Sequence, residues 1–218
     1  MHRAVHVDAS GVRLPGDLVV PDGARGVVLF AHGSGSSRHS PRNRQVATGL
    51  QDAGYGTLLL DLLTEAEERI DARTRMLRFD VRMLAGRLTA AADWLSLPEA
   101  AGDVPLAVFG ASTGAAAALF TAADRPDRIG AVISRGGRPD LAGDALDRVR
   151  APTLLIVGGA DRQVLELNRA AAARLTAVHD IAVVPGATHL FPEAGALEQV
   201  IDRSVHWLTT WLPSARPR

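Results

Sequence analysis

A serine between two glycines is the first feature of this sequence that could do chemistry. Residues 110–114 read G-A-S-T-G, between a short apolar run and a stretch of small apolar residues. A serine on a sharp turn from a strand into a helix has a strained backbone that lifts its hydroxyl out of the sheet. Glycines suit such a turn because they lack a Cβ where backbones approach closely. The context predicts Ser112 as a nucleophile, although serine is also a favourable helix N-cap.

A serine hydroxyl needs a base within hydrogen-bond reach to attack at neutral pH. Of the seven histidines, His189 follows the last predicted strand and precedes the last predicted helix. His179 precedes that strand, at the wrong end of the sheet, and His206 falls inside the last helix. His32 ends a strand, but the glycines after it indicate a structural role. His189 is therefore the predicted base, and the alternative is a loop histidine packed on Phe191.

A third group must orient the imidazole and stabilise its charged form. Asp161 follows the apolar run 153–157 through Gly-Gly-Ala and is the predicted acid. The alternative for Asp161 is an N-cap of the helix that follows, and the rival acids are Asp140 and Asp61. The resulting chain order, Ser112, Asp161, His189, is the order expected of the α/β-hydrolase fold.

Acyl transfer also needs donors aimed at the developing oxyanion. The turn itself supplies the backbone N–H of Thr113. The second donor is expected from the loop after the apolar run 26–31, where the sequence is H-G-S-G-S-S. We assign it to the N–H of Ser34, with Gly33 as the near alternative that also borders the substrate.

The elements that must position these residues follow from periodicity. Short Val- and Leu-rich runs indicate strands buried on both faces, at 26–31, 56–60, 104–109, 129–133, 153–157 and 181–184. Amphipathic or small apolar segments between them indicate helices at 43–53, 73–95, 113–123, 164–175 and 193–212. This alternation predicts a single α/β domain over 1–218, with a mostly parallel doubly wound sheet and helices on both faces. An N-terminal hairpin, 3–8 and 12–20, adds antiparallel strands at one edge, and 213–218 is expected to be a frayed tail.

Composition excludes several kinds of chemistry. The 218 residues contain no cysteine and no lysine, so thiolate nucleophiles, disulfides, Schiff bases and P-loop lysines are ruled out. Net charge is zero, from 24 basic and 24 acidic residues, which gives no global field toward nucleic acid or anionic lipid. No apolar stretch is long enough for a membrane span or a secretory signal. We therefore expect a cytoplasmic protein without nucleic-acid or membrane partners, acting on a small molecule.

The segment 134–151 is too short for a helical cap domain, which predicts an open, shallow site suited to small soluble esters. Arg135 and Arg138 lie on this loop, where an arginine could bind a substrate carboxylate. The alternative for both is a surface ion pair with Asp140 or Asp144. Asp61 and the acidic residues 65–68 are expected to form a solvated charge run that caps the long helix predicted over 73–95.

The sequence resembles the α/β-hydrolase superfamily over nearly the whole chain. The motifs that carry the resemblance are HGSGSS, GASTG, GGAD and GATH. Asp61-Leu62-Leu63-Thr64 and SRGGRPDLAG are similar to segments of its lidless, dienelactone hydrolase-like group. The resemblance implies ester hydrolysis without a metal or organic cofactor. The best-known members have Cys where this chain has Ser112, and Glu where it has Gly33, so their substrate does not carry over.

The sequence thus predicts a serine hydrolase that cleaves small carboxylic esters or lactones through an acyl-enzyme. Thioesterase, amidase or peptidase activity on the same triad is one alternative. A non-catalytic ligand-binding homologue is the other.

Overall fold

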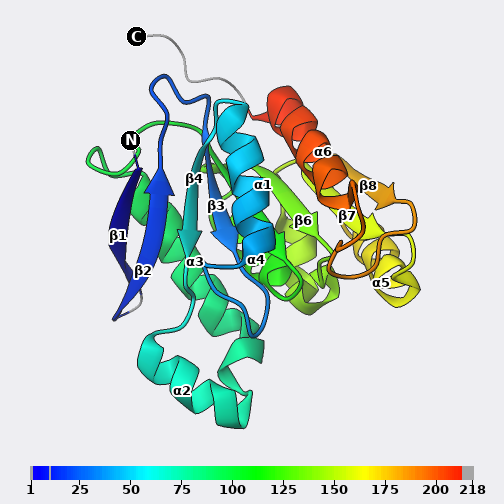
Figure 1. The fold of residues 1–218 in the computed structure, drawn as a ribbon, viewed down its shortest axis with the longest axis horizontal. Helices are drawn as coiled ribbons and strands as arrows, with labels where there is room; N and C mark the ends of the chain where they lie inside the picture. Colours follow the sequence, from blue (N-terminus) through cyan, green and yellow to red (C-terminus); the bar gives the residue numbers. More distant parts are fainter. Residues whose placement is uncertain (1, 10, 213–218) are drawn as a thin grey trace.

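The structure is a computed structural model and describes residues 2–9 and 11–212. These residues form one eight-stranded sheet, in the order β1-β2-β4-β3-β5-β6-β7-β8 (Figure 1). The strands are β1 (His2–Ala9), β2 (Val12–Val19), β3 (Val27–Ala31), β4 (Gly56–Leu60), β5 (Leu106–Ala111), β6 (Ile129–Arg135), β7 (Thr153–Gly158) and β8 (His179–Val184). The pairs from β4 to β8 are parallel, and β1–β2 and β2–β4 are antiparallel. The predicted α/β class and N-terminal antiparallel hairpin are confirmed.

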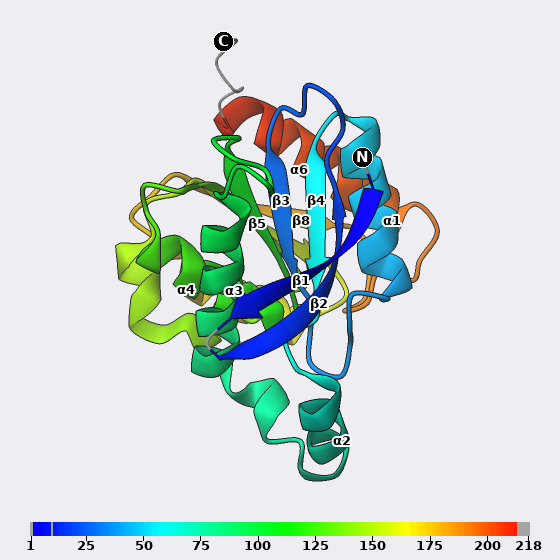
Figure 2. The same ribbon diagram turned by 90° about the vertical axis from the view of Figure 1, so that its left-hand side faces the viewer.

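The central strands are buried along their whole length because helices cover both faces of the sheet. The helices α1 (Pro41–Asp52) and α6 (Ala196–Trp211) pack on one face. The other face carries α3 (Val81–Leu95), α4 (Gly114–Asp124) and α5 (Arg162–Ala172). Figure 2 shows the two layers, with the β1–β2 hairpin crossing the near edge. Each face therefore has its own apolar core.

The single helix predicted over 73–95 is wrong. The structure has α2 (Glu65–Thr74), a short 3-10 turn η1 (Leu77–Phe79) and then α3. Arg75 ends α2 in the left-handed region, at φ 57°. Asp80 starts α3 as its N-cap, accepting the N–H of Met83 at 3.0 Å. An apolar stripe continues across this break, which is why spacing alone suggested one helix.

The acidic run 65–68 does not cap a helix over 73–95, and it is not fully solvated. It forms the first turn of α2, and Glu67 within it makes an ion pair with Arg87. The Thr64 hydroxyl accepts the N–H of Glu67, and the Glu67 carboxylate accepts the N–H of Thr64, which makes a capping box. Glu67 also binds buried Arg87 through both guanidinium Nη atoms, at 2.6 and 2.8 Å. The Arg87 hydrogen bonds lower the pKa of Glu67 to about 2. This ion pair fastens α2 to α3.

The carboxyl ends of the parallel strands share one edge of the sheet, the lower edge in Figure 1, beyond which α2 projects. After β6 the chain forms only a kinked 3-10 segment, η2 (Pro139–Arg148), so no helical cap follows this strand. The loops at this edge therefore carry the candidate site.

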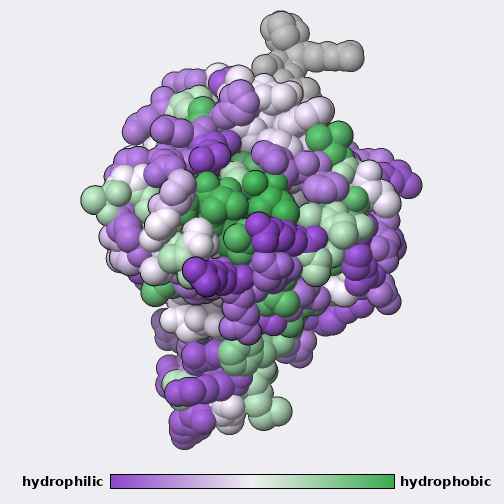
Figure 3. Space-filling view, turned by 90° about the vertical axis from the view of Figure 1, so that its right-hand side faces the viewer, coloured by the Kyte–Doolittle hydropathy of each residue, from purple (hydrophilic) through white to green (hydrophobic). Residues whose placement is uncertain are grey.

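The side of the molecule at β8 and α6, at the right in Figure 1, carries an apolar patch. Figure 3 shows hydrophobic side chains gathered at the centre of this face within a hydrophilic rim. A hollow of about 330 Å³ lies there, and its lining includes Leu154, Ala182, Trp207 and Trp211. None of the helices in the described part of the chain is long and apolar enough to cross a bilayer. The predicted frayed tail, 213–218, lies outside the described residues.

Candidate active site

Ser112 lies on a strained turn between β5 and α4. Its φ is 50°, in the left-handed region that side chains other than glycine rarely adopt. The flanking glycines permit the turn: a Cβ at Gly110 would lie 2.3 Å from the Cα of Ala115. A Cβ at Gly114 would lie 2.3 Å from the carbonyl oxygen of Ala31. Both neighbouring atoms belong to backbone, so no larger residue fits at either position.

The structure brings Ser112, His189 and Asp161 together from three separate loops. The Nε2 atom of His189 lies 3.3 Å from the Oγ of Ser112, and its Nδ1 lies 2.7 Å from Oδ2 of Asp161. The His189 side chain is 37% exposed and that of Asp161 is 16% exposed. A slightly long serine–histidine contact is usual without substrate. The arrangement is that of a nucleophile, a base and an orienting acid.

Asp161 does begin α5, but its carboxylate makes no capping hydrogen bond there and contacts His189 instead. The rival acids have other partners. Asp140 binds Arg138 through two hydrogen bonds, at 2.7 and 2.8 Å. Asp61 accepts the backbone N–H of Arg38 at 2.6 Å and also pairs with its guanidinium. The carboxylate that touches the base is therefore that of Asp161.

The backbone donors near Ser112 come from the turn and from the β3–α1 loop. Among the described residues, the N–H groups of Thr113 and Gly33 have no hydrogen-bond partner. The N–H of Ser34 instead donates to the Thr113 hydroxyl at 2.9 Å. Gly33 is close to the nucleophile, since a Cβ on it would lie 3.1 Å from the Cβ of Ser112. The N–H of Ser34 is thus occupied by the Thr113 hydroxyl, and the sequence analysis did not predict this contact.

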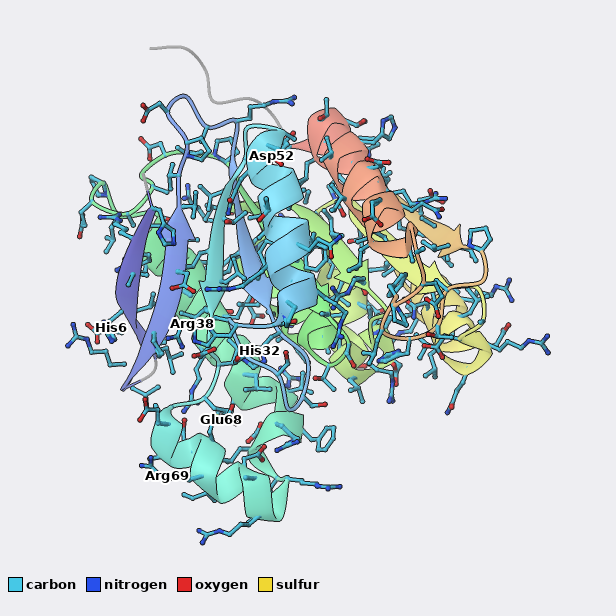
Figure 4. All side chains as sticks on the ribbon, viewed as in Figure 1. His6, His32, Arg38, Asp52, Glu68 and Arg69 are labelled. Carbon is cyan, nitrogen blue, oxygen red and sulfur yellow. The ribbon has the colours of Figure 1, made fainter. Side chains whose placement is uncertain are left out.

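His32 anchors the start of the β3–α1 loop. Its Nε2 accepts the N–H of Leu62 at 3.1 Å, and its Nδ1 donates to the Gly33 carbonyl at 2.9 Å. Burial lowers the pKa of His32, in keeping with a neutral imidazole that both donates and accepts. Figure 4 labels His32 and Arg38 at this edge, above Glu68 of α2. The structural role expected of His32 agrees with these contacts.

The two arginines singled out after β6 lie in different environments. Arg138 is paired with Asp140, the surface ion pair considered above as an alternative. Arg135, the last residue of β6, is 6% exposed and has no ion pair with any described residue. Its backbone carbonyl accepts the N–H of Ser112 at 3.2 Å. No group of three or more metal-binding side chains occurs among residues 2–9 and 11–212.

Comparison with known proteins agrees with the fold described above. The family model for the alpha/beta hydrolase fold matches residues 26–180. A dienelactone hydrolase structure from Anabaena variabilis is 54% identical, with a TM-score of 0.94 over 97% of this chain and 98% of that one. Est1E from Butyrivibrio proteoclasticus shares the fold at 17% identity, with a TM-score of 0.78 over 95% and 98% of the two chains.

Two Mycobacterium tuberculosis proteins that carry the provisional name phosphoribosyl transferase are each 53% identical over 98% of this chain. The chain spans about half of their length, 47% in each case. Their full-length name therefore describes a larger molecule. The family match and the near-complete structural match with the Anabaena protein carry the assignment: the chain belongs to the α/β-hydrolase family, as a dienelactone hydrolase-like member.

Proposed function

We propose that this protein is a serine hydrolase that cleaves small carboxylic esters or lactones through an acyl-enzyme. The observation that carries the proposal is the continuous hydrogen-bonded series from Asp161 through His189 to Ser112, at 2.7 and 3.3 Å. The strained φ of Ser112 supports it, because such strain persists only where the surrounding structure enforces it.

In the first half of the reaction, the Ser112 Oγ attacks the ester carbonyl carbon while the Nε2 of His189 takes its proton. Asp161 holds the other ring nitrogen and stabilises the imidazolium. The carbonyl oxygen becomes an oxyanion, for which the free N–H of Thr113 is the first donor. Collapse expels the alkoxide, which takes the proton from His189 and leaves Ser112 acylated.

In the second half, His189 removes a proton from water, which attacks the acyl carbon. A second tetrahedral intermediate forms and collapses, releasing the carboxylic acid and returning the proton to Ser112. The second oxyanion donor comes from the β3–α1 loop. We assign it to Ser34, freed when the Thr113 hydroxyl turns away, with the unpartnered N–H of Gly33 as the adjacent alternative.

The half-exposed His189 and the lack of a helical cap after β6 support small, soluble substrates. Thioester, amide or peptide cleavage would use the same three residues and differ only in the leaving group. The transferase name belongs to relatives about twice as long, and this half of them matches a hydrolase fold. The triad therefore favours hydrolysis over transfer of a phosphoribosyl group.

The test is covalent labelling combined with turnover. A fluorophosphonate should modify the wild-type protein at Ser112, identified by peptide mass spectrometry, and leave Ser112→Ala unmodified. A panel of short p-nitrophenyl esters, thioesters, lactones and anilides then ranks the leaving groups. Equal behaviour of wild type and Ser112→Ala in both assays would show a non-catalytic homologue.

A further inference from the structure

The backbone of Ser112 is held at both of its polar groups by residues 135–138, at the end of β6. Its N–H donates to the carbonyl oxygen of Arg135 at 3.2 Å. Its carbonyl oxygen accepts the N–H of Arg138 at 3.0 Å and, within the turn itself, the N–H of Ala115 at 3.1 Å. The left-handed φ of Ser112, 50°, persists only where its surroundings enforce it, and the bonds to 135–138 supply that constraint.

The first of these contacts continues into β7 through backbone alone. The carbonyl of Arg135 and the N–H of Gly136 belong to one planar peptide group, and that N–H donates to the carbonyl oxygen of Ile156 at 2.8 Å. A peptide plane bound at both ends cannot rotate without breaking both bonds. Every residue type at position 156 supplies the same carbonyl, so this anchor does not depend on side-chain chemistry.

The second contact ends on a side chain, that of Asn168 in α5. The carbonyl of Gly137 and the N–H of Arg138 also belong to one peptide group. The Nδ2 atom of Asn168 donates to the Gly137 carbonyl oxygen at 3.0 Å, and to that of Val164, one turn earlier in α5, at 2.8 Å. A continuous series of hydrogen bonds thus runs from Asn168 through this peptide group to the carbonyl of Ser112. Among the described residues, no other side chain binds either of the two peptide groups.

Two glycines in this segment allow the close approach. A Cβ at Gly137 would lie 2.6 Å from the Cβ of Ala115, at the start of α4. A Cβ at Gly136, whose φ is 52°, would lie 2.9 Å from the carbonyl oxygen of His189. The sequence S-R-G-G-R, residues 134–138, therefore packs its backbone against the nucleophile turn and the base together.

Asn168 is fully buried, and its position links the nucleophile to the acid. Both acceptors of its Nδ2 are carbonyl oxygens, so the amide nitrogen must face them. Asp161 lies between β7 and α5, and Asn168 follows it by about two helical turns. The two elements that anchor the Ser112 turn therefore also flank Asp161, and they lie next to each other in Figure 1. The bond to Gly137 leaves α5 and reaches the segment that holds the nucleophile.

We propose that Asn168 is a positioning residue, whose amide fixes the Ser112 turn in its strained conformation and keeps the hydroxyl within reach of His189. This inference rests on the proposed ester hydrolysis and adds to it a residue that does not touch the substrate. Without the amide, the peptide group of Gly137 loses one of its two anchors and can rotate away from Ser112. A displacement of reacting atoms by about 1 Å costs on the order of a hundredfold in rate.

Two substitutions of Asn168 test the role by turnover. Asn168→Leu keeps the approximate size and removes both hydrogen bonds. Asn168→Thr can still bond to the carbonyl one turn earlier, as Thr210 does with that of His206, but it is too short to reach Gly137. Both variants should lower kcat/KM for p-nitrophenyl butyrate about ten- to a hundredfold. The inhibition constant of butyrate, the acid product, should stay nearly unchanged, because binding does not require an aligned nucleophile.

Thr89→Val is the matched control for loss of a buried hydrogen bond. The Thr89 hydroxyl donates to that of Thr121 at 3.1 Å, between α3 and α4, and neither residue contacts the segment 134–138 through a hydrogen bond. This variant should keep the wild-type kcat/KM.

Amide hydrogen exchange, followed by NMR, gives a readout that is independent of activity. In both Asn168 variants the N–H of Arg138 should exchange at least about tenfold faster, because its peptide group has lost an anchor. The N–H of Gly136, which is anchored on β7, should keep its wild-type rate. General loosening of the fold would instead speed both amides equally, and that result would overturn the positioning role.

The outcomes separate this inference from the proposed function. An unchanged kcat/KM in both Asn168 variants, with an active wild type, would reject the positioning role and keep the hydrolase. Faster exchange confined to Arg138, without ester turnover by the wild type, would keep the anchor on the Ser112 turn and reject the hydrolase. If Asn168→Leu fails to fold, Asn168→Thr carries both measurements.

Discussion

Replacing Asp161 by Asn separates the catalytic role proposed for this residue from its place at a helix end. Asp161 lies at the N-cap of α5 but makes no side-chain capping bond, so within the described part of the chain the one hydrogen bond of its carboxylate is that to His189, at 2.7 Å. Asparagine is as favourable an N-cap as aspartate. The substitution should therefore leave the free energy of unfolding nearly unchanged.

The effect on activity should be large. A hydrogen bond to a charged partner contributes about 1.5–3 kcal/mol, and the carboxylate is only 16% exposed, so water replaces it poorly. An Asn that turns its amide N–H₂ toward Nδ1 also reverses the histidine tautomer, putting the proton on Nε2, where it faces Ser112. Together these effects cost on the order of 4–5 kcal/mol, which corresponds to a 10³- to 10⁴-fold fall in kcat.

The assay is kcat for a neutral p-nitrophenyl ester, with urea unfolding of the same samples. Asp140→Asn is the matched control: it makes the same chemical change in the rival acid, which binds Arg138 instead. We expect this control to retain most of its kcat. The reasoning is refuted if Asp161→Asn keeps wild-type turnover, or if Asp140→Asn loses it.

Further substitutions at Thr113, Gly114 and His32 test how the oxyanion loop is held. Thr113→Val should lower the free energy of unfolding by about 1 kcal/mol, because the part-buried N–H of Ser34 loses the acceptor that holds it in the resting state. Thr113→Ser keeps the hydroxyl and should retain wild-type stability, so a Ser variant that is equally destabilised in urea titration would contradict this reasoning. Gly114→Ala should destabilise folding by about 3 kcal/mol in urea titration, since its Cβ would meet backbone at 2.3 Å, and wild-type stability would contradict the close approach. His32 has a lowered folded-state pKa, so the unfolded chain takes up the proton first, and its contribution to stability is full above pH 6.5 and declines below it. His32→Phe should remove that decline, and should also lose about 1–3 kcal/mol at pH 8 through the unpaired N–H of Leu62; an unchanged stability-versus-pH curve would contradict it.

Apolar runs predicted the central strands well because a strand buried on both faces must be apolar throughout. The run 56–60 coincides with β4, and the others differ from the observed strands only at their ends. The edge of the sheet that carries the site followed from the parallel order, and with it the proximity of Ser112, Asp161 and His189. Each of these three residues follows an apolar run in the sequence, so its place at the end of a strand can be predicted from neighbouring residues alone.

Long-range and end-of-strand features could not be predicted in this way. The bond between Ser34 and Thr113 joins residues 79 positions apart, and no local pattern marks it. Arg135 appeared to be a loop residue because the apolar run stops at Ile133, whereas β6 continues through Arg135 and buries it. The left-handed residue Arg75, which divides the predicted long helix, is not glycine, so its sequence carries no breaking signal.

The distribution of the triad over β5, β7 and β8 has a consequence for refolding. Ser112, Asp161 and His189 meet only when every strand pair from β5 to β8 is in register, with β6 between the nucleophile and its partners. Such contacts between distant parts of the chain form slowly, after local helices. Recovery of the proposed ester hydrolysis after dilution from denaturant should therefore lag behind recovery of helical circular dichroism, so that activity would measure when the sheet is complete.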